Sequence, residues 1–397
     1  MEAQVFAFAD AVTELEEFAR EASISTSTRP IRSAIRRAYR EIVEAGDWTC
    51  LHVNGRIMLK AAQTTGTVSY VHSGGLFSRL LTLVGAIWPT DAEDWSVRIS
   101  TDDGDVVCDI ASRLTDTQVL LDATLNPGED VAAGASYMTY PRYYRLPNDF
   151  RSLDRPVEES FQGIGQYVTL ERMLELTQDN TDTGTIQYFT VAPIPDLIGA
   201  WGLFVQPAAD TSRPIEFVYK RIPRELKYVG TDIAESPGTI AITAGTAAVI
   251  GTSTVFVAGH AGSLLRIGTS ATRVPTGLDG LYPYAEQRVI ASYGSALSVT
   301  LDNTVTAAAS GVKYSITDPI DLDPSAYDAM IALAKKYLAI EKNAKNWQQI
   351  AALADERLHR AKMGDNRVYS RIVCGVQRSG SRLSDAPLSA TAESDIT

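Results

Sequence analysis

The sequence has few cysteines and histidines. Its 397 residues include 3 cysteines, Cys50, Cys108 and Cys374, which are widely spaced and form no C-x-x-C pair. Such a set predicts neither a disulfide framework nor a zinc site. The 4 histidines are equally scattered, without the H-E-x-x-H spacing of a metal-binding helix. We therefore expect no metal ion and no cofactor.

Long hydrophobic runs are also missing. The longest apolar stretch, residues 80–88, is interrupted by Thr82 and Gly85, and it is far shorter than the roughly 20 residues that a membrane-spanning helix needs. The start of the sequence shows no basic region followed by apolar residues, so no secretion signal is expected. We expect a protein that is made and kept in a reducing, aqueous compartment, without membrane contact.

Basic residues are in deficit. Lys and Arg total 36 against 48 Asp and Glu, which gives a formal net charge of -12. An acidic surface repels phosphate, so the composition disfavours a dedicated DNA-binding protein. The content of 45% hydrophobic and 21% charged residues is that of an ordinary globular chain. Its length allows two or three domains.

Catalytic motifs are absent as well. The sequence has no G-x-x-x-x-G-K-[ST], no G-x-G-x-x-G between a strand and a helix, and no G-x-S-x-G. Acidic pairs such as Asp102 and Asp103 lie in turn-like sequence, which hairpin turns explain without a ligand. No serine or cysteine is spaced to pair with a histidine base. We therefore expect no catalytic residues and no enzyme.

What the sequence does contain is one β-rich pattern used twice. Five runs recur in one order, at 66–70, 96–99, 107–112, 119–122 and 136–140, and again at 238–242, 264–267, 288–292, 297–302 and 313–317. Each run alternates apolar and polar residues, is rich in Val, Ile and Thr, and is bounded by Gly, Ser or Asp, as half-buried strands with tight turns are. We predict one sandwich-like or barrel-like β module in two copies, at 55–146 and 236–318.

Helical patterns precede the first copy. Apolar residues recur at steps of three and four over residues 8–22 and again after Pro30, and Gly46 ends the second pattern just before Trp48. These two helices would form a hairpin. The second also carries five arginines opposite its isoleucines, at Arg29, Arg32, Arg36, Arg37 and Arg40. They could face nucleic acid; we favour a solvated face that pairs with acidic groups of the first helix or of a neighbouring subunit.

A further helical pattern follows the second copy. Asp323 and Pro324 begin it, it resumes at Trp347, and Gly364 ends it. Whether residues 343–346 break it is left open; unbroken, it would be about 60 Å long. Residues 365–397 contain a strand-like piece at 368–376 and a Ser/Gly/Ala-rich end. We expect an extended arm that orders against another chain, with simple fraying as the alternative.

The middle of the chain holds a short helix at 169–178 and strand-like runs at 186–191, 201–206 and 214–220, which suggest an antiparallel meander. The aromatic residues Tyr143, Tyr144, Phe150 and Tyr167 could stack on sugars or bases, but packing of the β module against the helical core is the favoured explanation. The prediction is an α+β protein: a discontinuous helical bundle core with a meander at 1–54, 147–235 and 319–364, two inserted β modules, and an arm at 365–397.

This order of elements resembles a known family. A helical hairpin that ends in Gly46-Asp47-Trp48, a β insertion, the segment Tyr-Arg-Leu-Pro-Asn-Asp-Phe at 144–150, a meander and a closing helical region are similar to the head-to-tail adaptors of tailed bacteriophages, in particular the tubular adaptors of short-tailed phages. The Gly-Thr-Val and Gly-Thr-Ile openings of the two copies also look like β insertions of these virion proteins. The resemblance extends over residues 8–363, and the doubled β module departs from the simplest version of the family.

The resemblance implies a structural virion protein at the head–tail junction, made in the host cytoplasm. It implies a homo-oligomeric ring, typically of twelve copies, that docks under the portal protein, is continued by the tail nozzle or next tail component, and lets DNA pass through its lumen without sequence-specific binding. No catalytic residues carry over. The interface candidates are Arg29, Arg32, Arg36, Arg40, Trp48, Tyr337, Trp347, Tyr369 and Arg371.

Two other functions compete with this one. A β-rich tail or surface protein that binds host glycan would need an exposed aromatic shelf on both β modules, yet Trp88 and Trp95 of the first copy have no counterparts in the second. A tail-associated hydrolase would need two carboxylates that face one cleft.

Overall fold

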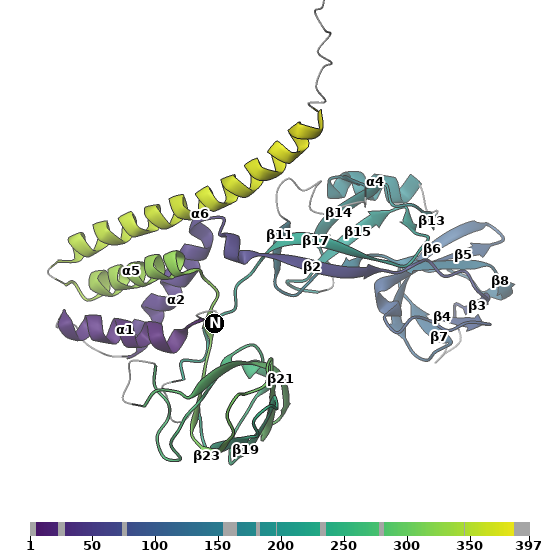
Figure 1. Cartoon of the computed structure of the whole chain (residues 1–397). Helices are drawn as coiled ribbons and strands as arrows, with labels where there is room; N and C mark the ends of the chain where they lie inside the picture. The colour runs from purple at the N-terminus through teal and green to yellow at the C-terminus, as the bar shows by residue number, and fades with distance from the viewer. Residues whose placement is uncertain are drawn as a thin grey trace, which may run out of the picture. The chain divides into compact units, whose positions relative to one another are not determined.

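Residues 5–22, 28–73, 78–153, 165–179, 183–195, 197–230, 236–277, 282–344 and 346–384 are described by a computed structural model, with side chains as far as Asp365. The chain divides into two compact units. Met1–Leu51 and Pro223–Thr397 form one, here called the helical unit, and His52–Ile222 form the other, the middle unit. Helices and strands are both present, as predicted, and each unit contains one seven-stranded sheet that curls on itself (Figure 1).

The helical unit takes its helices from both ends of the chain. They are α1 (Phe8–Glu21), α2 (Thr28–Ala45), α5 (Pro324–Glu341) and α6 (Trp347–Ser384). Their apolar faces meet in a single cluster of buried side chains that includes Leu15, Ile35, Met330 and Ala354. Asp323 caps α5 as predicted, because its carboxylate accepts a hydrogen bond from the Ala326 N–H at 2.7 Å.

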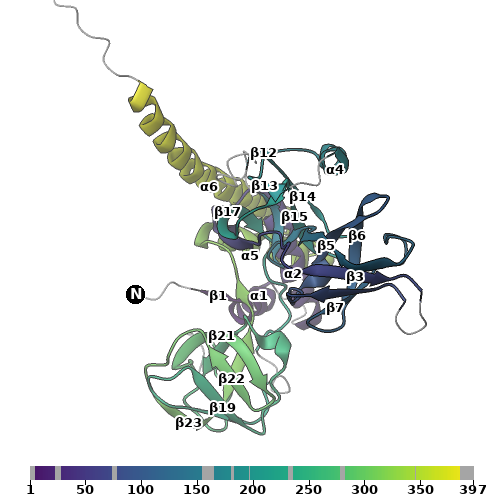
Figure 2. The ribbon, with the colours of Figure 1, turned by 90° about the vertical axis from the view of Figure 1, so that its right-hand side faces the viewer.

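The question of one or two C-terminal helices is resolved in favour of two. α5 ends at Glu341 and α6 begins at Trp347, and Asn343 between them has a φ of 53°, in the left-handed region that ends helices. α6 then runs through Gly364 and continues beyond the end of α5 (Figures 1 and 2). The predicted end at Gly364 and the predicted strand at 368–376 are therefore wrong. Val368, Ile372 and Val376 are also spaced by four, so the run fits a helix that is already under way.

The middle unit contains two small sheets besides its large one. β11 (Phe150–Leu153), β17 (Arg213–Arg221) and β2 (His52–Leu59) are ordered β11-β17-β2, and β10 (Tyr144–Arg145), β15 (Trp201–Gln206), β14 (Tyr188–Pro193) and β12 (Gln166–Tyr167) are ordered β10-β15-β14-β12. Helix α4 (Leu170–Asp179) and the short pair β13 (Thr183–Gly184) and β16 (Ala208–Ala209) complete the unit. The three runs predicted as one meander are thus divided, because β17 pairs with β2 and not with β15.

The two large sheets have one strand order. The first sheet, in the middle unit, is β8-β3-β4-β7-β6-β5-β9, and the second, in the helical unit, is β23-β18-β19-β22-β21-β20-β24. The strands of the first are β3 (Thr67–Val71), β4 (Leu80–Val84), β5 (Trp95–Thr101), β6 (Gly104–Arg113), β7 (Gln118–Leu121), β8 (Val131–Ala135) and β9 (Tyr137–Pro141). Those of the second are β18 (Thr239–Ile242), β19 (Ala248–Thr252), β20 (Leu264–Ile267), β21 (Glu286–Ser295), β22 (Ser298–Leu301), β23 (Ala309–Val312) and β24 (Tyr314–Thr317). Renumbering each sheet from its first strand gives the same order.

Small details of the two sheets also coincide. The Tyr137 hydroxyl donates to the Thr65 carbonyl at 2.8 Å, and the Tyr314 hydroxyl donates to the Pro237 carbonyl at 2.9 Å. In both sheets the next residue is a glycine with positive φ, 95° at Gly66 and 77° at Gly238. A Cβ at these glycines would lie 2.3 and 2.2 Å from a carbonyl oxygen of the neighbouring strand, so only glycine fits. Each sheet therefore begins next to a positive-φ position that only glycine can occupy.

A buried carboxylate fastens the second sheet to the helices. Asp318 follows β24 and is completely buried. Its side chain accepts hydrogen bonds from the Ser263 hydroxyl at 2.8 Å, from the Tyr228 N–H at 2.7 Å and from the Arg224 guanidinium at 3.0 Å. Its backbone carbonyl accepts from the N–H of Phe8, the first residue of α1, at 2.9 Å. One residue thus joins α1, the sheet and the segment after Pro223.

A second link joins the sheet to α1. Arg266 on β20 is 1% exposed, and its guanidinium pairs with Asp10 of α1 at 2.6 Å. The short strands β1 (Phe6–Ala7) and β25 (Pro319–Ile320), which adjoin Phe8 and Asp318 in the sequence, pair with each other. Figure 2 shows the curled second sheet adjoining the α1 end of the helical unit. The sheet is therefore fixed to the helices by polar contacts between residues that are far apart in sequence.

We predict that Asp318→Ala lowers the free energy of unfolding by about 3 to 5 kcal/mol, because it leaves Arg224 and the backbone N–H groups of Lys227 and Tyr228 without their buried partner. Urea unfolding measures the loss. Asp328→Ala on the exposed side of α5 is the control, and we expect it to change the free energy by less than about 0.5 kcal/mol. Equal effects of the two substitutions would contradict the role given to Asp318.

Candidate functional site

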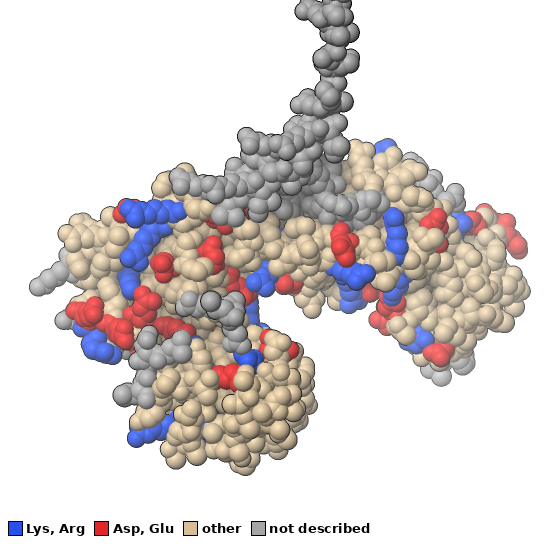
Figure 3. Space-filling model, viewed as in Figure 1, with Lys and Arg blue, Asp and Glu red and all other residues tan. Residues whose placement is uncertain are grey.

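The arginine face of α2 is partly engaged within its own unit. Arg36 donates through Nε to the Leu226 carbonyl at 2.7 Å, and the Arg37 guanidinium lies 4.0 Å from the centre of the Tyr337 ring. Arg29 and Arg40 are exposed, and Arg32 is half-buried. On the face shown in Figure 3, acidic side chains gather over α1 and the basic ones form no continuous field. Arg36 and Arg37 are exposed as well, so the arginine face is solvent-exposed even where its side chains have contacts within the unit.

Trp48 does not contribute to an exposed surface. Its side chain is fully buried in the cluster that joins the helices, and its indole N–H donates to the Ile42 carbonyl at the end of α2 at 2.5 Å. A buried indole that has its hydrogen bond is a packing residue. As an interface candidate Trp48 was wrong. The neighbouring Gly46 could have indicated that Trp48 packs inward, because a Cβ at position 46 would lie 3.0 Å from the Trp48 ring.

The other candidates lie near or on α6. Tyr337 is half-buried beneath Arg37, and Trp347 is 37% exposed at the start of α6. Leu353 and Met363 on the same helix are 50% and 46% exposed, whereas Ala354 and Ala361 are buried against the other helices. Tyr369 and Arg371 belong to α6, but their side chains lie outside the described part. The helix therefore presents apolar side chains on the side that its own unit leaves uncovered.

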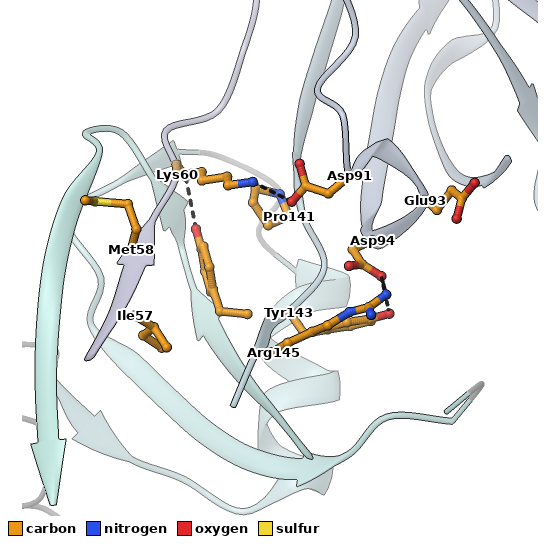
Figure 4. Close-up of a pocket in the computed structure, with 10 residues that line it drawn as sticks. Ile57, Met58, Lys60, Asp91, Glu93, Asp94, Pro141, Tyr143 and Arg145 are labelled. Carbon is orange, nitrogen blue, oxygen red and sulfur yellow. Dashed lines mark hydrogen bonds and ion pairs between the residues drawn. The ribbon is translucent and has the colours of Figure 1, made fainter. Parts of the chain in front are cut away.

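The middle unit has a pocket of about 480 Å³ between β2 and β10 (Figure 4). It is lined by Ile57, Met58, Lys60, Asp91, Glu93, Asp94, Pro141, Tyr143, Tyr144 and Arg145. Asp91 to Asp94 belong to the short helical turn η3 (Ala92–Asp94) and the residue before it. Tyr143 and Tyr144 were expected from the sequence to form a cluster, but the acids that surround them were not.

Every cation that lines the pocket already has an acidic partner. Lys60 pairs with Asp91 at 2.5 Å, and Arg145 pairs with Asp94 at 2.7 Å. Although burial acts to raise the pKa of Asp91, the ammonium group of Lys60 holds it below its ordinary value. Asp94 also accepts a hydrogen bond from the Tyr143 hydroxyl at 2.8 Å. Lys60, Arg145, Asp91 and Asp94 therefore compensate one another in two ion pairs, and Glu93 is the third acid of the lining.

The two tyrosines act as walls. Burial and then the Asp94 carboxylate raise the pKa of Tyr143 to about 12, and burial raises the pKa of Tyr144 to about 12. The Tyr144 hydroxyl donates to the Lys60 carbonyl at 3.0 Å, which ties the β10 side of the pocket to β2. Both phenols therefore stay protonated and serve to shape the pocket.

The predicted packing partner of the aromatic cluster was wrong. Tyr144 and Phe150 are buried between the two small sheets of the middle unit, with Tyr167 packed beside them. The Phe150 ring lies 5.8 Å from the Trp201 ring, and the Tyr167 ring lies 5.7 Å from the Phe189 ring. These aromatics pack on strands and not on the helical core, because the segment after the first sheet belongs to the middle unit as far as Ile222.

One buried histidine lies close to Asp318. His260, in the turn η5 (Ala258–His260), is 4% exposed, and its ring meets the Tyr228 ring edge-on at 4.6 Å. Its Nδ1 accepts from the Val257 N–H at 3.3 Å. Burial lowers the pKa of His260. The charge of Asp318 acts to raise this pKa, and the charge of Arg224 acts to lower it. The imidazole is therefore held neutral.

Within the described residues, no group of three or more His, Cys, Asp or Glu side chains is placed to hold a metal ion. The same residues include no helix with both the length and the hydropathy to cross a bilayer. Comparisons with protein-family models, with curated proteins and with solved structures found no match for this chain.

We predict that His260 makes the helical unit sensitive to acid. Since its folded-state pKa lies below the unfolded value of about 6.5, its contribution to stability is complete above that pH and is lost as the pH falls through the folded-state pKa. His260→Gln keeps an acceptor for Val257 and should flatten the fall in unfolding free energy between about pH 6.5 and 5. His359→Gln, on the exposed side of α6, is the control; parallel pH curves for all three proteins would overturn the prediction.

Proposed function

We propose that this chain is a structural virion protein, a head-to-tail adaptor of a tailed bacteriophage that assembles as a ring between the portal protein and the tail. One observation carries the proposal: helices from both ends of the chain share a single buried cluster. An architecture of this kind, with β segments inserted into a helical body, agrees with the order of elements that resembles the adaptor family. No catalytic role is assigned to any residue.

The helices form, in this proposal, a discontinuous bundle, and the two seven-stranded sheets are copies of one β module. The common strand order supports duplication. The shared tyrosine–carbonyl hydrogen bonds and the shared positive-φ glycines support it further, because unrelated sheets would have no reason to begin with the same turn. Trp88 also has a counterpart after all: its ring lies 5.6 Å from that of Tyr137, as the Phe256 ring lies 5.5 Å from that of Tyr314.

Contacts between copies would use the surfaces that the helical unit leaves exposed. Arg29 and Arg40 on α2 offer positive charge, and Trp347, Leu353 and Met363 on α6 offer apolar area. A ring needs two different complementary surfaces on each copy. The acidic chain, with a net charge of -12, suits a conduit that lets DNA pass without holding its phosphates. Twelve copies, a portal partner and a tail nozzle partner follow from the resemblance.

The rival function, glycan binding by a β-rich tail or surface protein, has less support. Trp88 and Trp95 are 1% and 3% exposed and lie in the core of the first sheet, so they form no aromatic shelf. Specific binding on a glycan array would nevertheless replace the adaptor proposal.

We predict that the purified protein, mixed with the portal protein of the same phage, forms rings that are visible by electron microscopy and measurable by native mass spectrometry. The double variant Arg29→Glu/Arg40→Glu should reduce ring formation about tenfold, because it places negative charge where the neighbouring copy meets positive charge. Arg151→Glu, an exposed arginine on β11, is the matched control and should assemble normally. Absence of rings from the unaltered protein would end the proposal.

A further inference from the structure

The outer face of α2 carries a stripe of arginines. At about 100° per residue, Arg29, Arg36 and Arg40 fall within about 40° of one another, on the side of the helix opposite its buried isoleucines. All three residues are exposed. From residue 29 to residue 40 the stripe is about 16 Å long. It is a basic surface several turns long in a chain whose net charge is -12.

The arginines of this stripe have no acidic partner among the described residues. Arg36 donates to the Leu226 carbonyl, and Arg40 donates through Nε to the Arg36 carbonyl at 3.4 Å. Arg37, at the border of the stripe, lies on the Tyr337 ring. These contacts hold the guanidinium groups without neutralising them, because a carbonyl oxygen or an aromatic ring carries no net charge. The stripe therefore keeps its positive charge, and part of it is already ordered for a partner.

A different arginine of α2 faces α1 of the same chain. Burial raises the pKa of Glu16 on α1, whereas the charges of Arg20 and Arg32 act to lower it, so Arg32 lies near the first helix. Arg32 is half-buried and lies about 60° around α2 from the centre of the stripe. Contact within the helical hairpin thus involves the flank of α2, and the arginine stripe itself stays open to another molecule.

An acidic stripe with the same spacing lies on α1. Acids recur there in steps of four, three and four residues, and α2 follows the same steps over residues 29, 33, 36 and 40, with a serine at the second position. Acidic side chains gather over α1 in Figure 3. Opposite charges that recur at one spacing can face each other along two helices. The acids of the stripe, on the side of α1 away from its buried residues, are Asp10, Glu14, Glu17 and Glu21.

Only half of this acidic stripe is used within the chain. Its first two acids pair with Arg266 and Lys335. The other two, Glu17 and Glu21, are exposed and lie one helical turn apart, and their carboxylates form no ion pair or hydrogen bond with a described residue. No other helix in the described part of the chain has two such acids on successive turns, because the remaining neighbouring acids on α4 and α6 include paired ones. α1 is therefore the helix that fits the arginine stripe by charge.

We propose that the arginine stripe of α2 in one copy of this chain docks on Glu17 and Glu21 of α1 in a second copy. The inference rests on the homo-oligomer of the proposed function and names a contact within it. Both stripes lie opposite the residues that α1 and α2 contribute to their shared core. Since the stripes are on different helices, each copy offers one stripe to each of two neighbours, and a head-to-tail contact of this kind can close a ring.

The test uses two charge-reversal variants of the full-length protein, Arg29→Glu/Arg40→Glu and Glu17→Arg/Glu21→Arg, in sedimentation velocity at low salt. Each variant alone should associate about tenfold more weakly than the unaltered protein, because like charges then face each other. An equimolar mixture of the two should recover the association, because every contact in an alternating assembly again joins opposite charges. Added salt should weaken the association of the unaltered protein, because exposed charges are screened.

The matched control is Asp102→Arg/Asp103→Arg, which reverses two exposed acids in the turn between β5 and β6. It should associate normally and should not rescue Arg29→Glu/Arg40→Glu. Recovery on mixing also shows that both reversed variants are folded.

Four outcomes would overturn the inference: no association of the unaltered protein at low salt, normal association of Glu17→Arg/Glu21→Arg alone, no recovery in the mixture, or equal recovery with the control variant. Rings that form with the portal protein although the mixture shows no rescue would remove this inference and leave the proposed function. Rescue in the mixture without rings from the unaltered protein and the portal would do the reverse.

Discussion

The helical unit depends on one completely buried carboxylate. Asp318 accepts hydrogen bonds from Arg224, Ser263 and the backbone of residues 227 and 228, and its own carbonyl holds the first turn of α1. An ion in a low-dielectric interior is costly unless all its hydrogen-bonding capacity is satisfied, and here the donors come from two separate parts of the chain, residues 224–228 and Ser263. The hydrogen bonds that satisfy the Asp318 carboxylate therefore form only when the second sheet is in its native position on the helices. Arg266 lies on β20, which pairs with β24, and its ion pair with Asp10 of α1 is a second polar link between the sheet and the helices.

The two sheets differ in how they use the same topology. Arg266 of β20 and Arg98 of β5 occupy equivalent places, opposite Ser315 of β24 and Met138 of β9. Arg266 is buried and pairs with a helix, whereas Arg98 lies 3.6 Å from Asp105 at the turn of its own hairpin. Arg266 thus links its sheet to α1, whereas Arg98 makes its ion pair within its own sheet.

Sequence patterns predicted the elements better than their partners. The periodic apolar residues of α1, α2 and α5 and the alternation in the sheets placed most elements, because these patterns are local. Trp48 and residues 368–376 were misjudged because an aromatic residue after a helix, or a run of Val and Ile, fits more than one environment. The pocket of the middle unit could not be predicted, since Lys60, Asp91 and Arg145 are brought together only by folding. The same holds for Asp318, because the hydrogen-bond partners of its side chain are up to 94 residues away along the chain.

The shared core of α1, α2, α5 and α6 has a consequence for biosynthesis. The amino-terminal helices leave the ribosome early, yet the apolar surface that covers them ends at Ala361. At about 5 to 20 residues per second, translation of the intervening chain takes on the order of 15 to 60 seconds. Throughout that interval Leu15, Ile35 and Ile42 lack their native neighbours. The nascent chain should therefore be a chaperone client until its carboxyl-terminal helices emerge, and the middle unit, whose sequence is continuous, can fold first.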